Sequence, residues 1–143
     1  QPFLSDEYVT LFVLGDNFFG NNPIKKINFS QILSDKGCCI FTYEVPNPSD
    51  FGVAVIEENK VISIEEKPDK PKSNKAIIGV YIYDNTLIDK IQTLEPSDRG
   101  EYEITDLNNL YIKEGSCMSE EIIGWWIDAG TPERIEELES KLV

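Results

Sequence analysis

The sequence of 143 residues contains no histidine, and this absence removes several kinds of active site. Without imidazole there is no Ser-His-Asp triad, no Cys-His pair and no histidine ligand for a metal ion. The three cysteines (Cys38, Cys39 and Cys117) are an odd number without C-x-x-C spacing, which argues against a zinc site or a disulfide scaffold. Such cysteine usage is typical of a reducing compartment, so we expect a cytoplasmic protein.

Basic residues are scarce, with 13 Lys and Arg against 26 Asp and Glu and a formal net charge of −13. A field this negative repels phosphate backbones, and Lys25-Lys26 is the only basic doublet, so we expect no nucleic-acid partner. No apolar run approaches the roughly 20 residues that cross a bilayer, and no signal peptide is visible, so we expect no membrane partner. The length and the 41% hydrophobic content predict a single globular domain over residues 1–143.

Apolar runs alternate with turn residues and helical patterns, which predicts an α/β domain with a mixed sheet. Residues 8–14 are a short, nearly uninterrupted apolar run ending at Gly15, typical of a parallel strand buried on both faces. A polar turn at 57–60 between two apolar runs predicts a hairpin. The further strands that we expect cover residues 38–45, 52–56, 61–65, 76–83 and 122–127.

Four helices are predicted from capping residues and apolar spacing. The first covers residues 24–36 and ends at Gly37. Asn85 or Thr86 can cap the second, and Thr105 can cap the third. Thr131-Pro132-Glu133 opens the last helix with a hydroxyl cap, a proline at the first position and an acid in the first turn. Its expected buried stripe consists of Ile135, Leu138 and Leu142.

Two aspartates follow predicted strands directly. Asp16 follows the run at 8–14, and Asp128 follows Trp125-Trp126-Ile127. Ligands of open α/β sheets bind at the carboxyl ends of strands, and carboxylates there are natural ligands for Mg²⁺. For each aspartate taken alone, the favoured interpretation is a residue that stabilises a turn through local hydrogen bonds. The spacing does not decide whether the two carboxylates converge.

A charged group ends the predicted hairpin, where Glu66-Lys67-Pro68 follows Glu65. A lysine held there can act as a point charge on a phosphate, and its acidic neighbour can accept hydrogen bonds from sugar hydroxyls. Pro68 favours an extended conformation for the residue before it. The plainer alternative is a solvated, charged strand end.

Taken together, the motifs resemble those of the sugar-1-phosphate nucleotidylyltransferases, most closely the branch that joins glucose 1-phosphate to thymidylate. The resemblance covers nearly the whole chain, and its motifs occur in the family's order. They are residues 13–17, 51–53, 65–68, 71–74, 79–84, 99–106 and 126–131.

This resemblance implies a Rossmann-like, three-layer nucleotidyltransferase fold and a transfer from a nucleoside triphosphate, with dTTP favoured, to a sugar 1-phosphate, with glucose 1-phosphate favoured. Asp16 and Asp128 would hold Mg²⁺, with Lys67 on the sugar phosphate as the third catalytic residue. Gly52, Glu66 and Tyr81 would border the sugar. Glu103 and Asp106 match the pattern without an assigned role.

One family feature is missing from the sequence. The family's glycine-rich loop, which cradles the triphosphate through backbone N–H groups, has no counterpart among these 143 residues. We therefore expect an N-terminally incomplete domain that is inactive alone and binds a nucleoside triphosphate only when that segment is supplied. Exposed sheet edges would follow, and a second copy of the chain could cover one. The alternative is a non-catalytic sugar-phosphate-binding or interaction module.

Overall fold

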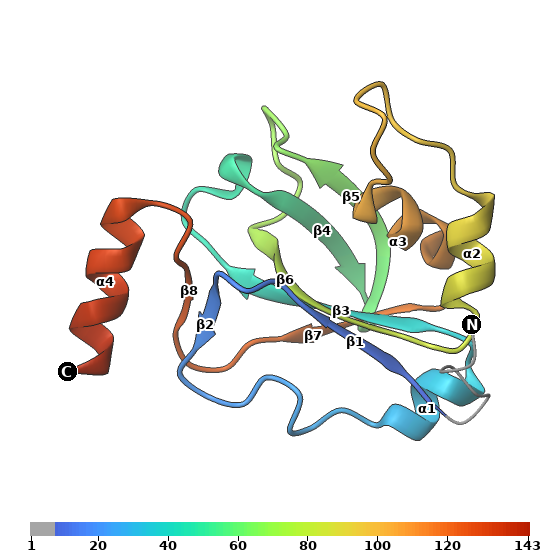
Figure 1. The fold of residues 1–143 in the computed structure, drawn as a ribbon, viewed down its shortest axis with the longest axis horizontal. Helices are drawn as coiled ribbons and strands as arrows, with labels where there is room; N and C mark the ends of the chain where they lie inside the picture. The colour runs from blue at the N-terminus through green and yellow to red at the C-terminus, as the bar shows by residue number, and fades with distance from the viewer. Residues whose placement is uncertain (1–7) are drawn as a thin grey trace.

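A six-stranded mixed sheet organises the computed structural model, which describes residues 8–143 (Figure 1). Its order is β1-β6-β3-β7-β5-β4; β3 and β7 run parallel, and the other paired strands run antiparallel. The β4–β5 hairpin also reaches β6, where Val53 lies opposite Ala76. The strands of this sheet are β1 (Thr10–Val13), β3 (Cys38–Glu44), β4 (Gly52–Glu57), β5 (Lys60–Glu66), β6 (Lys75–Tyr83) and β7 (Cys117–Glu121).

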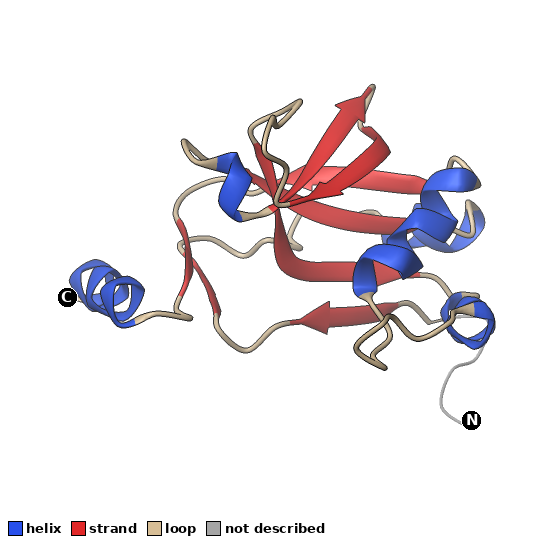
Figure 2. Ribbon diagram, turned by 90° about the horizontal axis from the view of Figure 1, so that it is seen from above, coloured by secondary structure: helices blue, strands red, loops and turns tan. Residues whose placement is uncertain are grey.

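Helices cover both faces of this sheet and give the expected three layers (Figure 2). On one face α1 (Phe29–Ser34) contributes Ile32 to a core that includes alternate residues of β6. On the other face α2 (Leu87–Thr93) and α3 (Ile104–Lys113) pack over Tyr81 and Tyr83. None of the helices formed by residues 8–143 is long and apolar enough to cross a membrane.

A second, two-stranded ribbon leaves the main body. It pairs β2 (Asn17–Phe19) with β8 (Trp126–Asp128) and connects the sheet to α4 (Pro132–Leu142), which projects to one side in Figures 1 and 2. The predicted cap of α4 is confirmed, because the Thr131 hydroxyl accepts from the Arg134 N–H. Leu138 is buried as expected, but Ile135 and Leu142 are exposed, so the predicted buried stripe is wrong for both.

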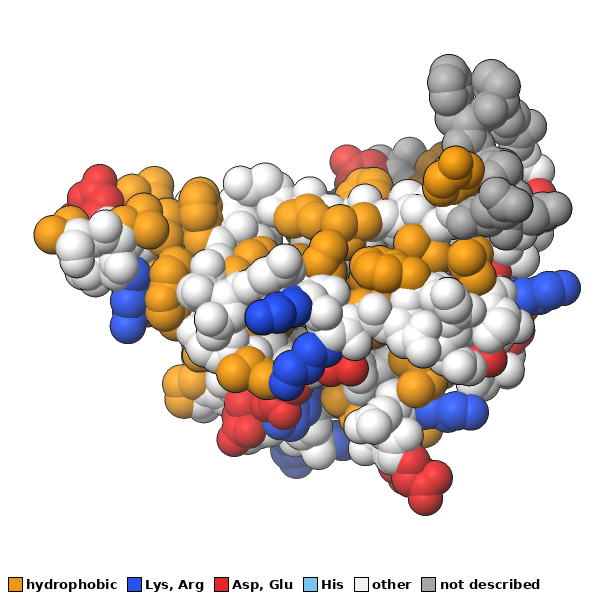
Figure 3. Space-filling view, turned by 90° about the horizontal axis from the view of Figure 1, so that it is seen from below, with side chains coloured by type: hydrophobic (Ala, Val, Ile, Leu, Met, Phe, Trp, Pro, Cys, Tyr) orange, Lys and Arg blue, Asp and Glu red, His pale blue; other side chains and the backbone are white. Residues whose placement is uncertain are grey.

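The first predicted strand differs from the structure in direction and in burial. β1 runs antiparallel to β6 at the edge of the sheet and is not the doubly buried parallel strand that its composition indicates. Half of the Phe12 and Val13 side-chain surfaces remain exposed, at 50% and 51%. β1 has a neighbour only on the β6 side among the described residues, so its apolar composition is not matched by burial. Figure 3 shows hydrophobic side chains gathered on the underside of the molecule.

Other helices and strands begin or end at residues that differ from the prediction, for local reasons. The first helix begins at Phe29, not 24, because the Asn28 side chain caps it by accepting from the Gln31 N–H. The predicted strand at 122–127 is confirmed only at residues 126 and 127, which belong to β8. Residues 122–125 are not part of a strand, and Gly124, at φ +95°, lies between β7 and β8. The third helix starts at Ile104, one residue before its expected cap. The hairpin turn is confirmed, with Glu58 and Asn59 both at positive φ as a type I′ turn requires.

Candidate active site

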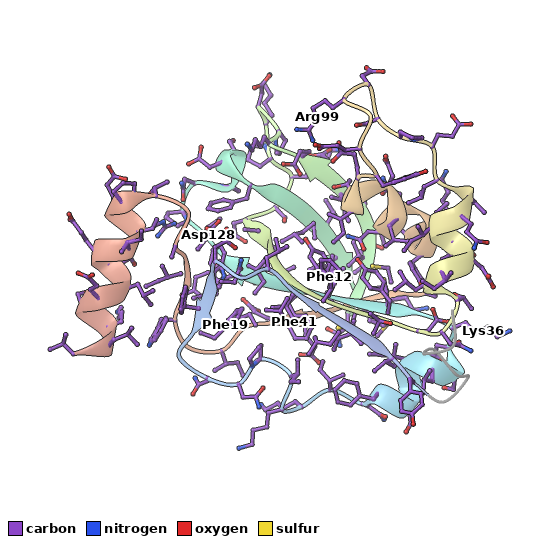
Figure 4. All side chains as sticks on the ribbon, viewed as in Figure 1. Phe12, Phe19, Lys36, Phe41, Arg99 and Asp128 are labelled. Atoms are coloured by element: carbon purple, nitrogen blue, oxygen red, sulfur yellow. The ribbon has the colours of Figure 1, made fainter. Side chains whose placement is uncertain are left out.

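The structure brings Asp16 and Asp128 together across the β2–β8 ribbon. Asn17 lies opposite Asp128 in the ribbon, and the Ala129 N–H donates to the Asp16 carbonyl at 2.8 Å. A Cβ atom built on Gly130 would lie 3.0 Å from Asp128 Oδ1 and 3.9 Å from Asp16 Oδ2. The two carboxylates therefore face one small space, which lies between α4 and the main sheet near the Asp128 label in Figure 4.

The donor set in this space fits a hard divalent cation. Asp128 Oδ1 accepts from the Gly130 N–H at 3.0 Å, so Asp128 also stabilises its own turn. Within residues 8–143, neither aspartate forms an ion pair with a lysine or an arginine. Two nearby carboxylates without a protein cation repel each other, and a bound Mg²⁺ would neutralise both. Gly130 keeps the space open, since a side chain there would press on Asp128.

The end of the β4–β5 hairpin forms a second corner of the site. Gly52 and Glu66 lie opposite each other in the hairpin, and a Cβ on Gly52 would come within 2.9 Å of Glu66 Oε2. The missing side chain leaves the Glu66 carboxylate lying against the Gly52 backbone. The Lys67 N–H donates to the Phe51 carbonyl at 3.0 Å and closes this corner.

Lys67 departs from the expected extended conformation. Its φ is +42°, in the left-handed region that non-glycine residues rarely adopt, although Pro68 follows it. The hydrogen bond to Phe51 holds this conformation, and the Lys67 side chain is exposed. The lysine is therefore presented to solvent at a fixed, strained turn.

One face of β6 joins the two corners. Ile77, Gly79 and Tyr81 alternate along the strand and point to the same side. Ile77 Cδ1 lies 3.9 Å from the Cβ position of Gly52, and the corresponding position on Gly79 lies 2.7 Å from Asn17 Nδ2. Residues two apart on a strand are separated by about 7 Å. Asn17, which follows Asp16, and Gly52 thus approach neighbouring positions on this face of β6.

Tyr81 lies beneath this surface rather than on it. Its ring is 6% exposed and stacks on Tyr83 with centroids 6.2 Å apart. Burial raises the pKa of Tyr81 to about 12, and the charge of Glu66 adds to the increase. The charge of Glu66 therefore acts on the buried Tyr81 hydroxyl.

Sequence reasoning missed the residues that connect the corners. The buried Trp126 ring packs against Phe51, with centroids 5.9 Å apart, and its Nε1–H donates to Asn17 Oδ1 at 2.8 Å. The Gly79 N–H donates to the same Asn17 oxygen at 3.1 Å. The sequence signal for Asn17 is its place after Asp16, and the signal for Gly79 is a glycine inside an otherwise apolar strand.

Two of the motifs that carry the resemblance have structural contacts. Ser73 Oγ donates to the Ala54 carbonyl at 2.5 Å, which fastens the 71–74 loop to the hairpin. Arg99 forms an ion pair with Glu103 at 2.9 Å, and this hydrogen bond lowers the pKa of the half-buried Glu103 carboxyl. The second contact orders the loop that leads into α3.

The chain is similar to known proteins over most of its length. The chain is 41% identical over 144 residues to a glucose-1-phosphate thymidylyltransferase of Neisseria meningitidis, covering 98% of this chain and 49% of that protein. It is 43% identical over 122 residues to one of Mycolicibacterium smegmatis, covering 82% of this chain and 42% of that protein. The chain thus spans about half the length of the relatives that it matches.

Solved structures give the same result. A crystal structure from Bacillus anthracis, described as a glucose-1-phosphate thymidylyltransferase in complex with sucrose, matches with a TM-score of 0.79 and 39% identity. That match covers 93% of this chain and 54% of the other. A UDP-glucose pyrophosphorylase matches with a TM-score of 0.75 at 21% identity, which shows a shared fold. The family model described as "Nucleotidyl transferase" matches residues 1–143, and this chain therefore belongs to the nucleotidyl transferase family.

Proposed function

We propose that this chain provides the metal- and sugar-phosphate-binding part of an enzyme that transfers a nucleotidyl group to a sugar 1-phosphate. Glucose 1-phosphate and dTTP are the favoured substrates, since the relatives at about 40% identity are glucose-1-phosphate thymidylyltransferases. The observation that carries the proposal is the approach of the Asp16 and Asp128 carboxylates to one space. The Glu66-Lys67 corner is joined to the same ribbon through the contact between Phe51 and Trp126.

Each residue has a separate role in the proposed reaction. A phosphate oxygen of the sugar 1-phosphate attacks the α-phosphorus of the triphosphate, and the bond to pyrophosphate breaks. Asp16 and Asp128 would hold Mg²⁺, which supplies charge neutralisation and alignment of the phosphates when bound. Lys67 would contact the sugar phosphate, Glu66 would accept hydrogen bonds from sugar hydroxyls, and the Gly52 backbone would lie against the sugar. Such a transfer depends on positioning and charge and needs no histidine.

Binding of the nucleoside triphosphate requires protein groups in addition to those described above. The 143 residues contain no glycine-rich phosphate loop, so we propose that triphosphate binding depends on a segment or partner that supplies one. The exposed edge of β1 can accept another strand or a second copy of this chain. A reducing, cytoplasmic setting suits the three buried, unpaired thiols.

Calorimetric titration of the chain with glucose 1-phosphate and Mg²⁺ tests the proposal. Binding should weaken strongly in Lys67→Met and in Asp16→Asn. It should remain in Lys70→Met, which removes an exposed lysine three residues away from Lys67. Unmodified glucose should show no dependence on Lys67. Absent binding, or equal binding by all variants, would contradict the proposed site.

A second assay separates the enzyme from a binding module. Release of pyrophosphate from dTTP, with glucose 1-phosphate and Mg²⁺ present, is measured with the chain and with Asp16→Asn. Release that disappears in the variant supports nucleotidyl transfer. Binding of glucose 1-phosphate without pyrophosphate release supports the non-catalytic module.

A further inference from the structure

We propose that Asn17 is a positioning residue whose side-chain amide orients the Asp16 carboxylate for binding a divalent cation together with Asp128. The inference rests on the proposed metal site. Asn17 Nδ2 donates to Asp16 Oδ1 at 2.8 Å. Asn17 Oδ1 accepts from the Gly79 N–H at 3.1 Å and from the Trp126 indole N–H at 2.8 Å.

The chemistry of its partners fixes which way the Asn17 amide faces. A backbone N–H and an indole N–H can only donate, so the amide oxygen must be directed towards Gly79 and Trp126. The amide nitrogen must then face Asp16, where an ionised carboxylate can only accept. A reversed amide would lose all three hydrogen bonds. The orientation of the donor at Asp16 is therefore set by the two groups that hold the oxygen.

Those two groups belong to well-packed parts of the molecule. Gly79 is buried within β6, and a Cβ atom there would come within 2.7 Å of Asn17 Nδ2, so the strand can approach Asn17 only as glycine. Trp126 is 6% exposed and packs against both Tyr43 and Phe51. Asn17 thus links the core to the carboxylate through one rigid side chain.

Asp16 depends on this link because its own side chain is exposed. Asn17 is the one residue within 8–143 that donates to the Asp16 carboxylate, whose Oδ2 is the atom nearer the space shared with Asp128. Holding Oδ1 leaves Oδ2 directed to that space and reduces the rotamer freedom lost when a cation binds. Partners that orient metal ligands in this way typically change metal affinity by roughly 10- to 100-fold.

A merely structural role for Asn17 is the competing explanation, because Asn17 also ties the ribbon to β6. The chain offers a matched control in Asn21, whose Nδ2 donates to the Ile123 carbonyl at 3.0 Å. This amide joins the segments that follow β2 and precede β8 without contacting Asp16. Asn21→Ala should disturb the ribbon without changing how the carboxylate is held.

Terbium luminescence gives a readout that is independent of catalysis. The two tryptophans of the chain are Trp125 and Trp126, so Tb³⁺ emission excited through tryptophan reports ions near this ribbon and not ions elsewhere on the acidic surface. Tb³⁺ is titrated alone and then displaced with Mg²⁺. Circular dichroism and thermal melting of each variant show whether the fold is retained.

We expect Asn17→Ala to weaken Tb³⁺ and Mg²⁺ binding by roughly 10- to 100-fold and Asn21→Ala to leave it within twofold of the original chain. Equal affinity in folded Asn17→Ala and Asn21→Ala would overturn the positioning role. If Asn17→Ala does not fold, Trp126→Phe is used, because it removes one of the two donors and leaves Trp125 as sensitiser; unchanged affinity there would overturn the role.

Asp16→Asn distinguishes this inference from the proposed function. If the original chain binds Tb³⁺ and Asp16→Asn does not, the metal site stands and the Asn17 comparison is decisive. If the original chain shows no tryptophan-sensitised binding, or Asp16→Asn binds equally well, the metal site is wrong and the role of Asn17 is wrong with it.

Discussion

Gly79→Ala perturbs the point where the core meets the candidate metal site. The added Cβ would lie 2.7 Å from Asn17 Nδ2, 2.8 Å from Leu14 Cβ and 2.9 Å from Leu14 Cδ1. Leu14 Cβ is bonded directly to the backbone, so a change of rotamer cannot move it away. The turn that carries Leu14 and Asn17 must therefore shift away from β6, and the hydrogen bond from the Gly79 N–H to Asn17 must lengthen.

The loss of unfolding free energy expected in Gly79→Ala follows from three contributions. Inserting a methyl group into packed surroundings costs typically about 1–3 kcal/mol. Loss of one hydrogen bond adds about 1 kcal/mol, and the lower chain entropy of alanine in the unfolded state returns about 0.4–1 kcal/mol. The net loss in unfolding free energy is therefore about 1–3.6 kcal/mol. For a domain of this size that corresponds to a fall in Tm of roughly 3–10 °C.

Urea denaturation monitored by tryptophan fluorescence measures this loss. Gly15→Ala is the matched control, because a Cβ at Gly15, one residue from the same aspartate, meets nothing within 4 Å. Gly15→Ala should be as stable as the original chain or slightly more stable. A Gly79→Ala variant with unchanged stability would refute the packing argument, and one that loses stability while keeping its full Tb³⁺ affinity would refute the link to the metal site.

Three further predictions concern the core and α4. The pKa of Tyr81 is about 12 in the folded chain and about 10 in the unfolded chain. The contribution of Tyr81 to the unfolding free energy is therefore complete below pH 10, and it should fall by about 2–3 kcal/mol as the pH rises from 10 to 12. The urea midpoint of unfolding should fall less steeply with pH in Tyr81→Phe than in the original chain. Equal pH dependence in the two chains would contradict the raised pKa of Tyr81. Tyr83→Phe leaves the buried Asn108 oxygen without its 2.8 Å donor and should lower the unfolding free energy by about 1–3 kcal/mol; no change in denaturation would show that Asn108 finds another partner. Thr131→Ala removes the cap bonded to the Arg134 N–H, so far-UV circular dichroism should show loss of helix at about 1 kcal/mol or less, and unchanged helicity would mean that α4 does not need its cap.

Much of the fold could be predicted because its signals are local. Alternation and turn residues located the hairpin, and the Thr131-Pro132 pair located the start of α4. The β1 segment was misplaced for a different reason: composition reports which environment suits a strand, whereas exposure depends on which neighbours are present. Their apolar side chains predict core positions for Phe12 and Val13, but both residues are half exposed at a sheet edge.

In the candidate site, too, some residues could be predicted from local motifs, whereas others depend on contacts between residues distant in sequence. Asp16 and Asp128 were identified through the motifs around them, and 111 residues of intervening sequence gave no information on their separation. Their approach depends on the register of the β2–β8 ribbon, which places Asn17 opposite Asp128. Trp126 could not be recognised as the link between the two corners, because its role arises from contacts with residues distant in sequence.

The backbone of Lys67, at the end of the hairpin corner, is strained. A non-glycine residue at φ +42° carries strain on the order of 1–3 kcal/mol. The hydrogen bond to the Phe51 carbonyl returns about 0.5–1.5 kcal/mol, which leaves part of that strain uncompensated. Glycine would adopt this conformation without strain, so a lysine at this position lowers stability. Backbone strain recurs at functional sites, so the strained turn at Lys67 is consistent with the contact to the sugar phosphate that we propose for this residue.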